Sequence, residues 1–122
     1  VIVSDHLPED EESKRLPFAQ AATGAIGVET LLPLSLEMYH NESLPLNKII
    51  ETLTINPSKI LKIKKGSLSK GSDGDICIFD LETPWAVKAE DLKSKSKNTA
   101  IEGRNLQGKV LMTFLNGELV FS

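Results

Sequence analysis

Residues 1–8 read VIVSDHLP, and this opening segment indicates the fold class most directly. Its first three residues are apolar and β-branched, which predicts a strand buried on both faces, as in a parallel sheet or a barrel. The segment Ser4–Arg15 that follows is dense in charge, which is typical of a solvated or ligand-facing loop. The C-terminal ends of barrel strands face the active site, so Asp5 would be placed to transfer a proton or bind a metal ion. Asp5 could equally cap the turn after the strand.

Three helices are predicted next along the chain. An apolar run predicts a helix from about Thr30 to His40, after Gly24 and Gly27 have allowed tight backbone turns. Pro45 opens a second helix with an apolar stripe at three- and four-residue spacing. The pair Asn56-Pro57 starts a third, which Gly66 ends.

After Lys65 the pattern changes from helical to alternating, which indicates a β-rich segment. Strands are predicted at Asp75–Asp80 and Trp85–Lys88. Residues 110–121 predict a hairpin around Asn116-Gly117, a pair that fits a two-residue type I′ turn. The intervening residues 89–104 predict a short helix and an exposed loop.

Composition narrows the class of protein. With 122 residues, 40% hydrophobic and 25% charged, the chain has the composition of one globular domain or part of one. The net charge of -3 disfavours nucleic acid and anionic membranes as partners, and no apolar run reaches the ~20 residues of a membrane-spanning helix. Cys77, the one cysteine, is predicted to be a small buried residue, which suits a reducing cytoplasm. The chain starts at Val1 without methionine, which hints at a fragment of a longer protein.

The chain has two histidines and no cluster of residues with the spacing of zinc ligands, so its residues alone do not assemble a complete zinc site. His40 ends an apolar helix, where interaction with the helix dipole or with solvent is expected. His6 could orient Asp5 through a hydrogen bond or pack under the loop. The acidic residues Asp10, Glu11 and Glu12 are predicted to be a solvated face, while Glu9 stays open.

Several motifs together resemble one family. SDHLP at residues 4–8 resembles the Asp-His-x-Pro signature after the eighth barrel strand of the cyclic amidohydrolases, which include dihydroorotases, allantoinases and dihydropyrimidinases. LPFA at 16–19 and GAIGVETLLP at 24–33 are similar to the dihydroorotase pattern. NPSKIL at 56–61, the glycine-rich residues 66–76 and SKSKNT at 94–99 fit type I dihydroorotases as well. The resemblance covers essentially the whole chain.

The resemblance implies an α/β fold, with the C-terminal strand and helices of a TIM barrel followed by strands of a small composite β-sandwich. Residues 1–65 would hold the terminal barrel strand, the active-site loop and helices, and residues 66–122 the sandwich segment. The chain would then be the C-terminal portion of a larger enzyme. The His-x-His motif, the carbamylated lysine and two further histidines of the family lie upstream of such a portion, so this chain alone would be inactive.

The resemblance also implies a chemistry: zinc-dependent, reversible hydrolysis of dihydroorotate to N-carbamoyl-aspartate in pyrimidine synthesis. Asp5 would contact a zinc ion of a binuclear site and shuttle a proton, which requires a carboxylate beside a dication. Backbone groups of Phe18 and Ala19 would bind the substrate ring. Ala19 replaces the usual glycine of the family without preventing this.

One position departs from the family pattern. Most dihydroorotases have a histidine four residues after the aspartate that helps to bind the substrate carboxylate, and Glu9 occupies that place. A carboxylate there would repel the substrate. Either Glu9 turns away and Lys14 or Arg15 supplies the cation, or the protein is a dihydroorotase-like subunit with little activity.

Two functions other than that of a dihydroorotase therefore remain open. An allantoinase or hydantoinase-type cyclic amidase shares the tail EGRNLQGKV at 102–110, and a non-catalytic homologue could serve as a structural partner. The expected partners are a small-molecule substrate, the remainder of the same polypeptide and a second copy in a homodimer, with aspartate transcarbamoylase as a further candidate. Unpaired strand edges predict that the isolated chain associates with itself or with the missing part.

Overall fold

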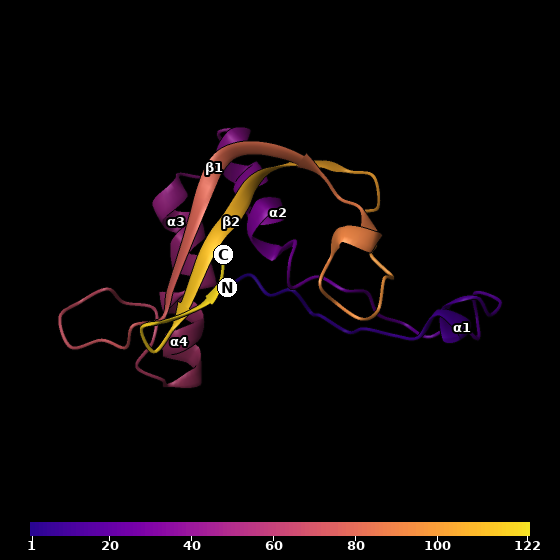
Figure 1. The fold of residues 1–122 in the computed structure, drawn as a ribbon, viewed down its shortest axis with the longest axis horizontal. Coiled ribbons are helices and arrows are strands. Elements are labelled where there is room, and N and C mark those ends of the chain that lie inside the picture. Colours follow the sequence, from indigo (N-terminus) through magenta and orange to yellow (C-terminus); the bar gives the residue numbers. More distant parts are fainter.

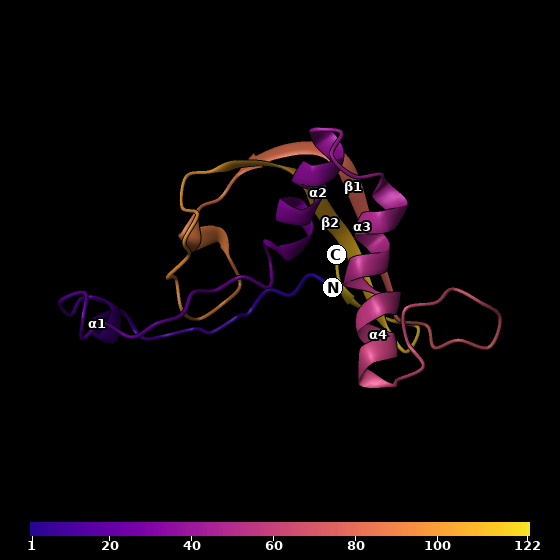
Figure 2. The ribbon, with the colours of Figure 1, turned by 180° about the vertical axis from the view of Figure 1, so that it is seen from behind.

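The computed structural model describes residues 1–122, which form helices on one side of a small antiparallel sheet (Figure 1). The elements are α1 (Glu11–Lys14), α2 (Leu31–His40), α3 (Leu46–Leu53), α4 (Ile55–Leu61), β1 (Ile76–Ala86), η1 (Ala89–Asp91), β2 (Asn105–Leu115) and β3 (Glu118–Phe121). Helix α2 packs on β2, and α3 packs on α2 and α4. Figure 2 shows the same arrangement from behind, with α3 and α4 in front of the sheet. Helix α1 stands apart on an arm.

The sheet has the order β1-β2-β3, and every neighbouring pair is antiparallel. The strands predicted at Asp75–Asp80 and Trp85–Lys88 are joined in the single strand β1, which begins at Ile76 and ends at Ala86, so that Val87 and Lys88 lie outside it. The pairing with β2 is irregular between Asp80 and Pro84, where the Asp80 carboxylate accepts hydrogen bonds from the amides of Glu82 and Thr83, both at 2.7 Å. This side-chain turn replaces part of the β ladder, which explains why the sequence indicates two strands.

The predicted hairpin is confirmed. Strand β2 ends at Leu115 and β3 begins at Glu118, so Asn116 and Gly117 form the two-residue turn. Their φ angles are 52° and 84°, and a type I′ turn requires positive φ at both positions. Asp75, just before β1, holds this turn, because its carboxylate accepts a hydrogen bond from the Asn116 amide at 2.9 Å.

The helices are confirmed with shifted ends. α2 and α3 begin at Leu31 and after Pro45, as expected. α4 begins at Ile55, so Asn56 and Pro57 lie inside its first turn and not at its start; Pro57 is tolerated there because first-turn amides have no helical acceptor. The helix ends at Leu61, and not at Gly66; the next residue, Lys62, caps it in a left-handed conformation with φ 56°. No helix of the chain combines the length and the apolar character needed to cross a bilayer.

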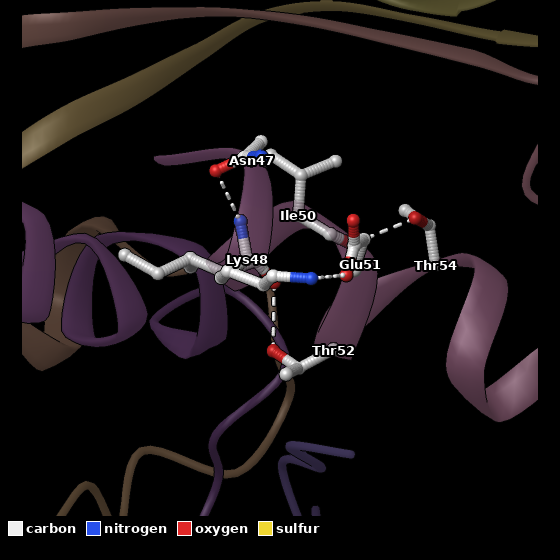
Figure 3. A network of polar contacts seen from close by, with 7 residues as sticks. Asn47, Lys48, Ile50, Glu51, Thr52 and Thr54 are labelled. Atoms are coloured by element: carbon white, nitrogen blue, oxygen red, sulfur yellow. Dashed lines mark hydrogen bonds and ion pairs between the residues drawn. The ribbon is translucent and has the colours of Figure 1, made fainter. Parts of the chain in front are cut away.

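The polar network on α3 stabilises only that helix (Figure 3). Lys48 pairs with Glu51 at 2.8 Å, and the hydroxyls of Thr52 and Thr54 donate to carbonyls of Ile49 and Ile50, both at 2.7 Å. Each of these contacts joins two residues that are three or four positions apart, and the ion pair is exposed. Such pairs contribute a few tenths of a kcal/mol, about 0.2–0.5. The network therefore marks no chemical site.

The core lies where the two parts of the sequence meet. Ile26 packs with three buried residues of the β-rich part, Val87, Leu92 and Leu106. The Trp85 indole packs against this cluster and donates to the Gly108 carbonyl at 2.9 Å. The core thus includes residues from both sides of the expected division after residue 65. The division itself remains a prediction.

Only 11 of the 122 residues are buried, so this chain leaves much of its apolar surface open. Val1–Val3 forms no strand, contrary to expectation, and Val1 and Val3 are 57% and 69% exposed. A strand needs a partner for its backbone groups, and within this chain the segment makes one such bond, from the Ile2 amide to the Thr52 carbonyl at 3.2 Å. Cys77 is also exposed, contrary to expectation. Partial desolvation raises the pKa of its thiol.

Asp80 gives the fold a testable dependence on pH. Hydrogen bonds from the Thr83 and Glu82 amides lower the pKa of its carboxyl below the ordinary 3.8. These hydrogen bonds therefore stabilise the folded protein fully above about pH 4, the ordinary pKa of the carboxyl. Their contribution to stability is lost as the pH falls through the lower pKa that Asp80 has in the folded protein. We expect thermal unfolding to shift to lower temperature on acidification below pH 4, and to shift less in Asp80→Asn, which keeps the acceptor oxygen. Glu82→Gln removes an adjacent exposed carboxylate and is the control; a curve identical for all three proteins contradicts the assignment.

Candidate active site

Asp5 lies in what we call the Asp5 loop, residues 4–9. It has a φ of 46°, in the left-handed region that favours glycine and that aspartate adopts more readily than most residues. Its side chain is exposed and lines a mainly apolar cavity together with Ile26, Leu31 and Ile101. Backbone strain of this kind persists only where surrounding structure holds it, and it concentrates at functional sites. Glu42 and Lys62 share this conformation, so it is compatible with both the functional role and the turn cap.

The surrounding structure is a close approach of two backbones. The Asp5 loop runs beside residues 23–27, which we call the glycine segment, and the Leu7 amide donates to the Ala25 carbonyl at 3.0 Å. A Cβ atom on Gly24 would lie 2.7 Å from the Leu7 carbonyl oxygen, and one on Gly27 would lie 2.9 Å from that of Ser4. Both glycines are thus needed for the contact. Gly24 also has φ 125°, which only glycine adopts without strain.

His6 joins this contact and does not contact Asp5. Its Nδ1 accepts hydrogen bonds from the amides of Gly27 at 3.1 Å and Val28 at 3.3 Å. An Nδ1 that accepts leaves the ring proton on Nε2 in the neutral form. Of the two roles open for His6, the structure supports packing under the loop.

Phe18 and Ala19 follow α1 on the projecting arm, and Phe18 is fully exposed at 101%. The turn there is closed by the amides of Gln20 and Ala21, which donate to the Pro17 carbonyl at 2.7 and 2.9 Å. No hydrogen bond joins either residue to Asp5. Helix α1 itself was not expected in the charged loop; its signal is Asp10, which caps it by accepting the Ser13 amide at 2.8 Å.

Glu9 lines a second cavity, which has no apolar side chain except that of Pro8. Lys14 faces it but donates to the carbonyls of Ala22 at 2.6 Å and Gly24 at 3.0 Å, and Arg15 pairs with Glu11. The two cations that sequence reasoning offered for the substrate carboxylate are therefore engaged elsewhere.

Lysines of the β-rich part line the same cavity. Lys97 donates to the Leu92 carbonyl at 2.6 Å, whereas the exposed Lys95 makes no such contact. Lys95 is therefore the free cation on this wall, beside Glu9. The sequence predicted only an exposed loop here, because nothing local relates Lys95 to a loop that lies more than 80 positions away.

The side chains of Glu29, Ser96 and Asn98 make long-range hydrogen bonds that the sequence did not predict. The Glu29 carboxylate accepts the backbone amides of Lys93 at 2.9 Å and Ser94 at 3.0 Å. Ser96 and Asn98 bond to the backbones of Glu9 and Gly24, at 2.7 and 3.0 Å. The signal was present in the motifs GVET and SKSKNT, but no spacing in the sequence relates one motif to the other.

No three histidine, cysteine, aspartate or glutamate side chains of this chain gather as a metal site. His40 lies in a different cavity with Glu37 and Arg104, which form an ion pair at 2.8 Å, and its Nε2 is buried without a hydrogen-bond partner. Asp5 is exposed and suited by its oxygens to bind a divalent ion, so this chain fits one ligand of a metal site and not the whole of it.

The fold of this chain is similar to part of several solved enzyme structures. The fold matches the crystal structure of dihydropyrimidinase from Brevibacillus agri NCHU1002 with a TM-score of 0.90, at 22% identity over 96% of this chain and 27% of that one. It matches L-hydantoinase (dihydropyrimidinase) from Arthrobacter aurescens with a TM-score of 0.78, at 32% identity over 85% of this chain and 24% of that one. The chain thus has the fold of the corresponding quarter of these enzymes.

The sequence matches the amidohydrolase family over residues 1–120, and the chain belongs to that family. It is 42% identical to a dihydroorotase of Anaplasma phagocytophilum (strain HZ) over 120 residues, which are 98% of this chain and 27% of that protein. It is 37% identical to a dihydroorotase of Geobacter sp. (strain M21) over 98% of this chain. The resemblance to dihydroorotases inferred from the motifs is confirmed. The chain spans about a quarter of the length of these relatives.

Proposed function

We propose that this chain is the C-terminal part of a dihydroorotase, which hydrolyses (S)-dihydroorotate reversibly to N-carbamoyl-L-aspartate in pyrimidine synthesis. The observation that carries the proposal is the 42% identity to a dihydroorotase over 98% of the chain, in a segment that holds Asp5 in a strained conformation beside a cavity. In this proposal residues 1–65 belong to a TIM barrel and residues 66–122 to a composite β-sandwich, and the protein acts in the cytoplasm.

Asp5 would be the one zinc ligand contributed by these residues. When bound, zinc polarises water and the ring carbonyl, which eases attack on the amide. The Asp5 carboxylate takes the proton that the attacking water loses and gives it to the ring nitrogen as the C–N bond breaks. The oxygens of Asp5 can do both because a carboxylate accepts a proton in one step and releases it in the next. In this proposal backbone groups of Phe18 and Ala19 bind the substrate ring.

The open apolar surface supports completion of the fold by the rest of the polypeptide. Exposed large apolar residues lie on both β2 and β3; they are Leu111, Met112, Leu115, Leu119, Val120 and Phe121. Surfaces of this kind are covered by another part of a protein or by a partner. We propose the remainder of the same polypeptide as the cover, a homodimer as the assembly, and aspartate transcarbamoylase as a further partner. Sedimentation of residues 1–122 alone should then show self-association.

Assays of the full-length polypeptide test the proposed activity. We expect zinc-dependent turnover of dihydroorotate, and none with residues 1–122 alone. Turnover of a hydantoin or allantoin in its place would favour the hydantoinase-type alternative, which the 32% identity to the Arthrobacter aurescens enzyme keeps open. No turnover of any cyclic amide in a zinc-loaded protein would favour the non-catalytic alternative.

Glu9 predicts a change in substrate binding. In the proposed site its carboxylate lies where a histidine of most relatives binds the substrate carboxylate, so Glu9→His replaces a repulsion with an attraction. We expect KM for dihydroorotate to fall by about three- to tenfold, equal to roughly 1 kcal/mol, in steady-state assays of the full-length protein. Glu12→His, the same change on exposed α1, is the control. An unchanged KM would mean that Glu9 points away from the substrate and that another cation, such as Lys95, neutralises it.

A further inference from the structure

Residues 93–99, which we call the serine-lysine segment, grip the Asp5 loop and the glycine segment at several points. The Ser96 hydroxyl donates to the Glu9 carbonyl at 2.7 Å, and the Asn98 amide group donates to the Gly24 carbonyl at 3.0 Å. The Ile26 amide donates to the Asn98 carbonyl at 3.2 Å. The serine-lysine segment is thus bonded to both backbones between which Asp5 is held.

The side chains of Ser96 and Asn98 are in contact, although the single proton of the Ser96 hydroxyl can be donated to only one acceptor at a time, the Glu9 carbonyl or Asn98 Oδ1. Ser96 and Asn98 are both partly buried, and the Ser96 hydroxyl also lies against the Asn98 Oδ1. The Gly24 carbonyl oxygen accepts two hydrogen bonds, one from the Lys14 ammonium group at 3.0 Å and one from the Asn98 side chain. A path of polar contacts therefore runs from the Glu9 backbone through Ser96 and Asn98 to Gly24.

A clamp at the far end fixes the serine-lysine segment itself. Glu29, just before α2, accepts the amides of Lys93 and Ser94 through both carboxylate oxygens. Leu92, at the start of the segment, is buried in the core. The segment is therefore anchored independently of the loop that it holds, as a support must be.

We propose that Ser96 and Asn98 are positioning residues for Asp5: they hold the strained Asp5 loop from the β-rich part without touching the substrate. This rests on the proposed function. The left-handed φ of Asp5 requires that neighbouring structure restrain it. The bond at Glu9 restrains the end of the Asp5 loop, and the bond at Gly24 restrains the glycine segment that lies beside the loop. Displacement of a proton-transfer group by about 1 Å can reduce turnover by about a hundredfold.

The test uses the full-length protein with Ser96→Ala, Asn98→Ala and the double variant. The matched control is Ser94→Ala, which removes a hydroxyl from the same segment that makes no hydrogen bond of its own. We expect kcat of the double variant to fall by about tenfold or more while KM changes by less than about threefold, since Asp5 and not substrate binding is disturbed. Ser96→Thr, which keeps the hydroxyl, should restore most of the kcat lost in Ser96→Ala. Ser94→Ala should behave as the unsubstituted protein.

Hydrogen exchange provides a readout that does not depend on activity. Amides of residues 5–9 and 22–26 should exchange faster in the single and double variants, while those of β1 and β2 keep their rates. Exchange in the Asp5 loop equal to that of Ser94→Ala, or a kcat equal to that control, overturns the proposal. If the unsubstituted protein does not turn over dihydroorotate, the proposed function fails, and the exchange rates alone decide whether Ser96 and Asn98 hold the loop.

Discussion

Asp5→Asn in the full-length protein is expected to reduce turnover of dihydroorotate by about a hundredfold or more. Proton transfer by a positioned side chain contributes about 10²- to 10⁴-fold to catalysis, and an amide cannot take up and release the proton. Asparagine has nearly the same shape and also adopts left-handed φ, so the φ of 46° remains accessible and the loop should keep its conformation. The measurement is kcat with dihydroorotate at saturating zinc, together with zinc content.

Asp10→Asn is the matched control for this variant. It removes a carboxylate only five positions away, but Asp10 caps α1 and its oxygen still accepts the Ser13 amide after the change. We expect its kcat to stay within about twofold of the unsubstituted protein, because a surface charge removed outside the site has little effect. Equal activity of Asp5→Asn and Asp10→Asn would remove Asp5 from the mechanism.

Gly24→Ala is expected to have the largest effect on stability, a loss of about 2 to 4 kcal/mol. The new Cβ would lie 2.7 Å from the Leu7 carbonyl oxygen, a backbone atom that can move only if the Asp5 loop separates from the glycine segment. In addition, φ 125° is unfavourable for any residue with a side chain. Thermal or denaturant unfolding of the full-length protein measures the loss.

Gly103→Ala is the control that measures the cost of a positive φ without the close approach of a second backbone. Gly103 also has a positive φ, 75°, but a Cβ there would meet nothing within 4 Å. Its variant should lose about 1 kcal/mol, the cost of a left-handed alanine alone. If both variants lose the same amount, the close approach of the two backbones contributes nothing and strain in φ is the whole effect.

The elements predicted correctly are those whose signals are local. Helix α2, the start of α3 after Pro45 and the Asn116-Gly117 turn follow from periodicity and from residues whose backbone preferences are strong. The end of α4 was wrong because Lys62, not a glycine, takes the left-handed position. The two predicted strands of β1 are one because Asp80 bends a strand without ending it.

Burial was predicted least well. Cys77 and Val1–Val3 are apolar and were expected inside, yet they are exposed. A sequence pattern states that a residue favours burial, but the element that covers it must be present for the burial to occur. In the proposed function that cover lies outside residues 1–122.

For the site, the residues after the first three made Asp5 a candidate, but the local pattern fitted a turn cap equally well, and only the resemblance to the cyclic amidohydrolases implied a catalytic role. The tertiary structure alone revealed the left-handed backbone of Asp5, the engagement of Lys14 with carbonyls and the grip of Ser96 and Asn98. These last contacts join residues 87 and 74 positions apart. Local patterns determine which helices and turns form, whereas contacts over such separations depend on how the elements pack, and no spacing in the sequence records them.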